Sequence, residues 1–372
     1  MTVSVRSFAK INLGLHIGAR REDKFHELLT VYQTIGLHDV IGVSVGRGNG
    51  IEIVCGDPRV PRDESNTCYR IVEKAMRALN AKGRVTIEIE KKLPVQGGLG
   101  GASSNAVATL LGLERVLKKF LSATERLRIS TEVGSDLPLF LVGGTTLGVG
   151  RGEQVYPLED LPAMACVVVV PEVGVSTPRA FADWDRLCGA GTLAGEGSGK
   201  RNAVHRMERS ERAGLRPPRT GRACPELVEG NARPHMDHAD TSSVKLTPPA
   251  PSDRINELGR GLSAWLSERY SGAPFRRGRR ENPLLELVRA GIKNDFEEVV
   301  FPEYPELSEG KSALEHAGAK YASLSGSGST LYGLFASKEA ARAAVAKLRR
   351  QGWAAQATVT LMRREYWKRV IG

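Results

Sequence analysis

Cysteine is scarce in this sequence, and long apolar runs are missing. Five cysteines occur among 372 residues and no two form a Cys-x-x-Cys pair, which argues against a disulfide framework and against a zinc site. The most apolar window, residues 165–170 (ACVVVV), is far too short to span a bilayer. The first residues lack the apolar run of a signal peptide. We therefore expect reduced thiols and a cytoplasmic protein without a membrane partner.

Charge is concentrated in one part of the chain. The net charge of +11 would, taken alone, suggest a nucleic-acid or anionic-membrane partner. Residues 186–280 carry +8 of it, however, and all the other residues together carry only +3. The basicity therefore belongs to one segment, and we expect no nucleic-acid partner. A non-catalytic protein that binds nucleotide or nucleic acid remains the alternative from a different functional class.

The length of 372 residues suits two domains. Strand and helix patterns follow one another without a steady βαβ alternation, which favours an α+β fold. We place the boundary near residue 160, which gives domains of residues 1–160 and 161–372. Residues 186–252 are rich in Gly, Arg, Pro, Ser and Thr and show little apolar periodicity. They predict a disordered insertion within the second domain.

A glycine-rich segment, residues 94–105 (PVQGGLGGASSN), is the strongest local signal. It follows a strand pattern at 85–93 and leads into a helix pattern at 103–117. Glycines permit positive φ and a close approach of the backbone to a ligand. The free N–H groups at a helix start bind anions. The segment therefore predicts a triphosphate-binding loop, with a flexible turn as the alternative, although no Walker A Gly-Lys-Ser/Thr follows it.

A second turn of small residues occurs late in the chain. Residues 323–335 (SLSGSGSTLYGLF) place serines and glycines between two apolar runs. One interpretation is a tight hairpin turn. The other is a small-residue surface that packs against the first glycine-rich loop.

Three polar side chains are candidates for chemistry. Phosphoryl transfer needs positioning and charge neutralisation more than covalent chemistry, so one aspartate and one lysine would suffice. Asp136 precedes an apolar helix pattern and would otherwise be its N-cap. Lys10 lies in an apolar strand pattern and would otherwise be a solvated lysine. His26 would otherwise be a hydrogen-bonded loop histidine.

Three motifs together resemble the GHMP kinases. They are AKINL at 9–13, PVQGGLGGASS at 94–104 and SGSGS at 325–329, in that order along the chain. The resemblance implies a two-domain α+β fold. Its N-terminal domain is ribosomal-protein-S5-like, and its C-terminal domain is a ferredoxin-like α/β sandwich.

Three further stretches resemble one family of that group, the 4-diphosphocytidyl-2-C-methyl-D-erythritol kinases. They are 24–39, 134–153 and 294–307. The resemblance implies ATP-dependent phosphorylation of the substrate's 2-hydroxyl, in the non-mevalonate route to isoprenoid precursors, with Mg²⁺ accompanying ATP. A mevalonate or homoserine kinase is the alternative within the group. We expect a small-molecule substrate and a monomer or homodimer.

The resemblance also assigns roles to individual residues. Lys10 and Asp136 are the expected catalytic pair. The expected substrate-binding residues are Asn12, Phe25, His26 and Phe181, with His26 contacting the cytosine and the two phenylalanines stacking on it. The expected ATP-binding residues are Asn66, Pro94, Val95, Gln96, Gly97, Gly98, Leu99, Gly100, Gly101, Ala102, Ser103 and Ser104. No metal ligand is assigned.

Overall fold

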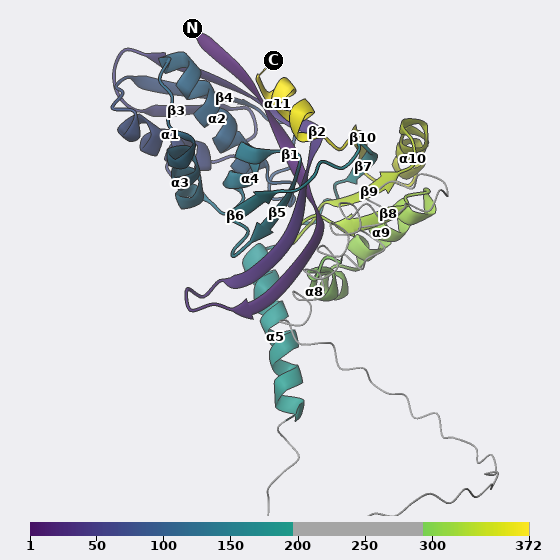
Figure 1. Cartoon of the computed structure of the whole chain (residues 1–372). Helices are drawn as coiled ribbons and strands as arrows, with labels where there is room; N and C mark the ends of the chain where they lie inside the picture. The colour runs from purple at the N-terminus through teal and green to yellow at the C-terminus, as the bar shows by residue number, and fades with distance from the viewer. Residues whose placement is uncertain (196–292, 372) are drawn as a thin grey trace, which may run out of the picture. The chain divides into compact units, whose positions relative to one another are not determined.

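The computed structural model describes residues 1–195 and 293–371. In this part of the chain, strands form two sheets (Figure 1). The first contains β1 (Thr2–Arg20), β2 (His26–Gly46), β3 (Ile51–Cys55), β4 (Arg84–Glu90), β5 (Thr145–Val149) and β6 (Gln154–Pro157). The second contains β7 (Ala165–Val169), β8 (Tyr321–Leu324), β9 (Leu331–Phe335) and β10 (Ala355–Val359). Most strand pairs are antiparallel, so the predicted α+β class is confirmed.

Helices follow or separate these strands. In the first half of the chain they are α1 (Thr67–Ala78), α2 (Gly101–Leu117), α3 (Ala123–Val133) and α4 (Leu137–Val142). The later helices are α5 (Thr177–Gly195), α8 (Glu297–Glu303), α9 (Pro305–His316), α10 (Lys338–Arg350) and α11 (Arg363–Ile371). No helix among the described residues is both long and apolar enough to cross a membrane.

Strand order explains how the two long strands organise the molecule. The first sheet has the order β3-β4-β2-β5-β6, and β1 pairs with β2. Only β3 and β4 run parallel in it. The second sheet has the order β10-β7-β9-β8. β1 and β2 form one hairpin of 19 and 21 residues, and shifts in its register allow the ribbon to bend.

An apolar cluster joins the two sheets. Ile11 and Val31, from the long hairpin, pack with Val168 and Tyr332 of the second sheet, and all are at most 3% exposed. The Tyr332 hydroxyl also donates to the carbonyl of Asn12 at 2.8 Å. The described residues up to 189 and from 293 onward therefore belong to one compact unit. The domain boundary near residue 160 stays a prediction.

The predicted insertion at 186–252 overlaps the end of α5. The helix continues to Gly195, so the first ten residues of that segment are helical and not disordered. The apolar positions 180, 184 and 188 of this helix recur every four residues, which suits a helix with one buried side. The rest of the predicted insertion lies outside the described residues.

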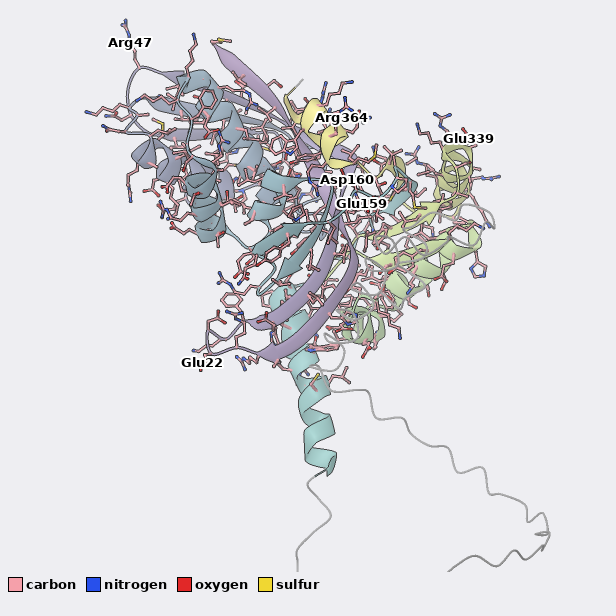
Figure 2. All side chains as sticks on the ribbon, viewed as in Figure 1. Glu22, Arg47, Glu159, Asp160, Glu339 and Arg364 are labelled. Atoms are coloured by element: carbon pink, nitrogen blue, oxygen red, sulfur yellow. The ribbon has the colours of Figure 1, made fainter. Side chains whose placement is uncertain are left out.

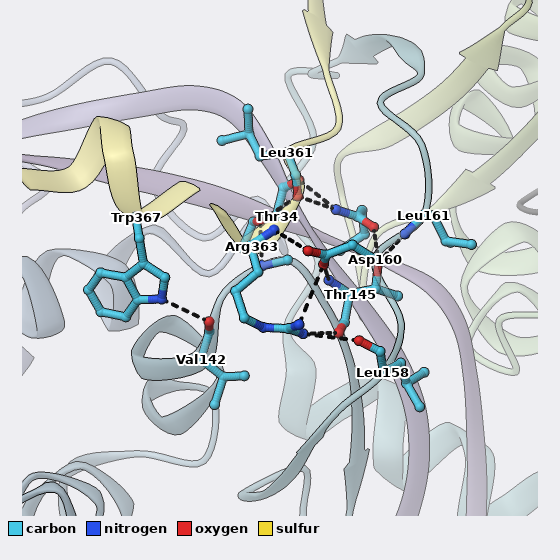
Figure 3. A network of polar contacts seen from close by, with 11 residues as sticks. Thr34, Val142, Thr145, Leu158, Asp160, Leu161, Leu361, Arg363 and Trp367 are labelled. Carbon is cyan, nitrogen blue, oxygen red and sulfur yellow. Dashed lines mark hydrogen bonds and ion pairs between the residues drawn. The ribbon is translucent and has the colours of Figure 1, made fainter. Parts of the chain in front are cut away.

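The C-terminal helix α11 is fastened to the first sheet by a polar network (Figure 3). The Asp160 carboxylate accepts from the backbone N–H of Arg363 at 2.7 Å and from that of Thr145 at 3.3 Å. The Arg363 guanidinium donates to the carbonyls of Thr145 and Leu158 at 2.8 and 3.2 Å. The indole of Trp367 donates to the carbonyl of Val142. The network therefore ties the chain end to β5, the β6 edge and α4.

We predict that Arg363→Ala lowers the free energy of unfolding by about 2 kcal/mol, because it leaves partly buried carbonyls without their charged donor. Arg364 is the matched control: it is exposed at the surface (Figure 2), and Arg364→Ala should change stability by less than about 0.5 kcal/mol. Urea denaturation of both variants measures the difference. Equal effects would contradict the anchoring role of Arg363.

Candidate active site

One cleft of about 570 Å³ brings the expected residues together. Its lining includes Lys10, Asp136, the four expected substrate-binding residues, Asn66 and the loop from Pro94 to Ser103. Ser104 is the exception. It is 2% exposed and accepts a hydrogen bond from the hydroxyl of Ser7 at 2.7 Å, beneath the loop. Ser103 therefore contributes the hydroxyl at this point of the cleft.

The glycine-rich loop adopts a conformation that requires glycine. Gly98 and Gly100 have φ of 76° and 69°, in the left-handed region that favours glycine. Gly100 is the N-cap of α2, no side chain caps the helix there, and its first turn contains no acidic residue. The first N–H groups of α2 and its dipole are therefore available to an anion beside the cleft.

The second turn of small residues packs directly on this loop. The Ser325 hydroxyl donates to the Gly98 carbonyl at 3.0 Å, and the Thr330 N–H donates to the Gly97 carbonyl at 3.2 Å. A Cβ on Gly98 would lie 2.1 Å from the carbonyl oxygen of Ser325. The turn also connects the antiparallel strands β8 and β9. Both interpretations of this motif are therefore correct.

Lys10 is buried beneath the loop. It is 3% exposed, so the interpretation as a solvated lysine is wrong. Its ammonium donates to the amide oxygen of Asn12 at 2.6 Å and lies 3.6 Å from a carboxylate oxygen of Asp136. Burial lowers the pKa of Lys10, and the nearby Asp136 opposes this shift. The backbone N–H of Lys10 donates to the Leu99 carbonyl, which fixes the loop over the strand.

Asp136 lies at the start of α4 without capping it. Its residue occupies the N-cap position, but its side chain makes no capping hydrogen bond. Instead the Tyr32 hydroxyl donates to its carboxylate at 3.2 Å. Burial, and next the negative charge of Asp136, raise the pKa of Tyr32 well above its usual value. Tyr32 therefore remains a phenol that donates a hydrogen bond to the carboxylate.

His26 lines the same cleft beside an aromatic group formed by Phe181 and Phe296. The rings of His26 and Phe181 are stacked, with centroids 4.9 Å apart and planes 7° apart. Phe296 meets Phe181 edge-on at 5.0 Å. The Nε2 atom of His26 lies 2.6 Å from a carboxylate oxygen of Asp185 on α5. The ring of Phe181 therefore faces His26 in this structure, and stacking on a substrate base stays a prediction.

Phe25 lies in the turn between β1 and β2, the turn that carries Glu22 in Figure 2. It is 52% exposed, and the Arg151 guanidinium lies over its ring at 4.9 Å. Lys24, just before it, has φ of 69°. This backbone lies in the left-handed region, which glycine adopts more readily than lysine.

Both polar atoms of the Asn66 side chain form hydrogen bonds with nearby backbone. Its amide oxygen accepts from the Cys68 N–H at 2.9 Å and so caps α1, while its amide nitrogen donates to the Pro61 carbonyl at 2.6 Å. It still lines the cleft. Its expected contact with nucleotide stays a prediction.

Sequence-based reasoning missed several residues of the site, among them Tyr32, Asp185 and Phe296. Tyr32 meets Asp136 only through the tertiary fold, 104 residues apart in sequence, so no local pattern indicates it. Asp185 follows Phe181 by four residues and therefore shares its helix face. That spacing could have identified Asp185, given Phe181 as a starting point.

Comparisons with known proteins agree with this geometry. Residues 66–144 match the family model of the GHMP kinases N terminal domain, and residues 278–354 match that of the GHMP kinases C terminal. A solved structure of homoserine kinase from Cytophaga hutchinsonii shares the fold. Its TM-score is 0.62 at 17% identity, over 97% of this chain and 95% of that one. The fold and the site thus define a GHMP kinase.

The particular family follows from sequence identity. The chain is 32% identical to a 4-diphosphocytidyl-2-C-methyl-D-erythritol kinase from Solibacter usitatus, over 90% of this chain and 82% of the relative. It belongs to the 4-diphosphocytidyl-2-C-methyl-D-erythritol kinase family. A solved 4-(cytidine 5'-diphospho)-2C-methyl-D-erythritol kinase has the same fold. It gives a TM-score of 0.61 at 24% identity, over 96% of this chain and 99% of that one.

We predict that Gly98→Ala destabilises the protein by about 3 kcal/mol and weakens ATP binding, because the new Cβ meets backbone at a positive φ. Gly56→Ala is the control. A Cβ there has no neighbour within 4 Å, so the change should be within about 0.5 kcal/mol. Thermal unfolding and ATP titration test both variants. Unaltered stability and ATP affinity in Gly98→Ala would refute the packing described for the loop.

Proposed function

We propose that this protein transfers the γ-phosphoryl group of ATP to the 2-hydroxyl of 4-diphosphocytidyl-2-C-methyl-D-erythritol. The observation that carries the proposal is the position of the Lys10–Asp136 pair. It lies in one cleft with the anion-binding start of α2 and with the aromatic group around His26. A phosphate donor and a base-bearing acceptor can therefore meet at the pair.

The glycine-rich loop is proposed to hold the ATP phosphates. The α2 N–H groups that no side chain caps supply hydrogen-bond donors, and the helix dipole favours negative charge at this end. Lys91 also lines the cleft. Its ammonium lies 2.7 Å from Asp39, which also accepts from the N–H groups of Lys92 and Leu93. Asp39 thereby fixes the chain at the entrance to the loop.

Asp136 is proposed to orient the acceptor hydroxyl and to receive its proton. The hydroxyl oxygen forms a bond to the γ-phosphorus while the bond from that phosphorus to the β,γ-bridging oxygen breaks, and ADP leaves. Because such transition states are loose, positioning contributes as much as proton removal. The ammonium of Lys10, 3.6 Å from Asp136, is proposed to stabilise negative charge on the transferring group.

Mg²⁺ is proposed to accompany ATP. Among the described residues, no group of three or more His, Cys, Asp or Glu side chains could form a metal site, and Asp136 is the one carboxylate in the described lining of the cleft. Such a site suits an ion that keeps most of its ligands from phosphates and water. The ion would neutralise phosphate charge. Ser103 and Asp136 are among the cleft side chains that could offer it an oxygen ligand.

We predict that Asp136→Asn lowers kcat on 4-diphosphocytidyl-2-C-methyl-D-erythritol by about 10²–10⁴-fold and changes ATP affinity little. The amide can still accept from Tyr32 and keeps the shape of the side chain, so the fold should be retained. Steady-state kinetics and ATP titration measure the two effects. Full activity in the variant would remove Asp136 from the mechanism, and an inactive parent enzyme would overturn the proposed function.

We also predict that activity falls as the pH rises through the pKa of Lys10. Burial places this pKa below its ordinary value of 10.5, and only the protonated amine can stabilise phosphoryl charge. In the pH profile of kcat/KM, the midpoint of the alkaline fall should therefore lie below pH 10.5. In Lys10→Arg the guanidinium stays charged, so this midpoint should move to higher pH although kcat falls. An unmoved midpoint would show that another group causes the alkaline fall.

A further inference from the structure

The contact between His26 and Asp185 has no part in the proposed phosphoryl transfer. It bears on which imidazole nitrogen of His26 carries the proton. His26 is 7% exposed, and its Nε2 lies 2.6 Å from the Asp185 carboxylate. The guanidinium of Arg20 lies 3.9 Å from the other carboxylate oxygen. An ionised carboxylate only accepts hydrogen bonds. The Nε2 atom must therefore carry the proton in this contact.

We propose that Asp185 is a positioning residue that sets the tautomer of His26 and thereby makes the cleft selective for cytosine over uracil. With the proton on Nε2, the Nδ1 atom of a neutral imidazole carries a lone pair and accepts. Nδ1 makes no hydrogen bond within the described part of the chain, and the ring lines the cleft. An acceptor is thus presented to the ligand.

Cytosine and uracil differ at the exocyclic group that would face such a hydrogen-bond acceptor. Cytosine carries an exocyclic amine, which donates. Uracil carries a carbonyl oxygen at the same place, and two acceptors facing each other leave both unsatisfied. An imidazole protonated on both nitrogens would instead donate from Nδ1 and lose this preference. This inference rests on the proposed function, because it concerns the base of the same substrate.

The helix α5 gives Asp185 a fixed position. Asp185 and Phe181 are one helical turn apart and therefore share a face, so the ring that stacks on His26 and the carboxylate that contacts its Nε2 come from one rigid element. The hydroxyl of Thr177, at the start of α5, lies 2.7 Å from that of Ser327 in the second small-residue turn. The helix is thereby held at the cleft.

Nitrogen-15 NMR of histidine-labelled protein tests the tautomer directly, with the His26 signal assigned by its loss in His26→Gln. We expect the parent to show a His26 tautomer with the proton on Nε2. We expect Asp185→Ala to show a mixture of tautomers. An imidazolium, or a proton on Nδ1, in the parent protein would overturn the proposal, as would an unchanged signal in Asp185→Ala.

Calorimetric titration with CDP and UDP tests the selectivity. Asp185→Ala should weaken CDP binding in proportion to the imidazole that loses the Nε2 proton, about twofold for an even mixture of tautomers. It should not weaken UDP binding, so the ratio of CDP to UDP affinity should fall. Asp185→Asn keeps an acceptor oxygen and should recover part of the loss. The control is Asp183→Ala, on the same helix, whose carboxylate contacts Arg186; it should leave both affinities unchanged.

The experiments distinguish failure of the role proposed for Asp185 from failure of the proposed function. If the parent phosphorylates 4-diphosphocytidyl-2-C-methyl-D-erythritol but Asp185→Ala keeps the ratio of CDP to UDP affinity, only the role of Asp185 is wrong. If the parent does not phosphorylate that substrate, the proposed function itself is wrong, whatever the nucleotide affinities are.

Discussion

The rest of the site depends on keeping the buried charge of Lys10 paired. An ammonium out of water is costly unless an opposite charge and hydrogen-bond acceptors surround it. Asp136 and the Asn12 amide provide them, and Tyr32 steadies Asp136 in turn. The same residue holds the glycine-rich loop through its backbone N–H. Loss of the pair would therefore disturb the charge balance, whereas the backbone hydrogen bond to the loop does not depend on the Lys10 side chain.

The cleft also depends on contact between the two sheets. The glycine-rich loop belongs to the first half of the chain, and the turn that packs on Gly98 belongs to the second. Backbone lies so close to backbone there that a side chain on Gly98 has no room. The apolar cluster around Ile11 and Tyr332 maintains this contact. Stability and the conformation of the proposed phosphate-binding loop consequently depend on the same packing.

Local signals allowed much of this to be predicted from the sequence. The strand expected at 85–93 and the helix expected at 103–117 correspond to β4 and α2, since alternation and periodicity are encoded in consecutive residues. The positions of Ser104 and Tyr32 were not predictable in this way. Ser104 differs from Ser103 only in the helix face it occupies, and Tyr32 reaches Asp136 across 104 residues of chain.

The most direct test is a substrate panel with phosphorus NMR of the product. The purified protein, ATP and Mg²⁺ would be incubated with 4-diphosphocytidyl-2-C-methyl-D-erythritol, mevalonate or homoserine under matched conditions. A cleft lined by Lys10, Asp136 and His26 predicts turnover of the cytidine-bearing substrate, with a new phosphate monoester on the 2-hydroxyl. Turnover of mevalonate or homoserine in its place would contradict this function.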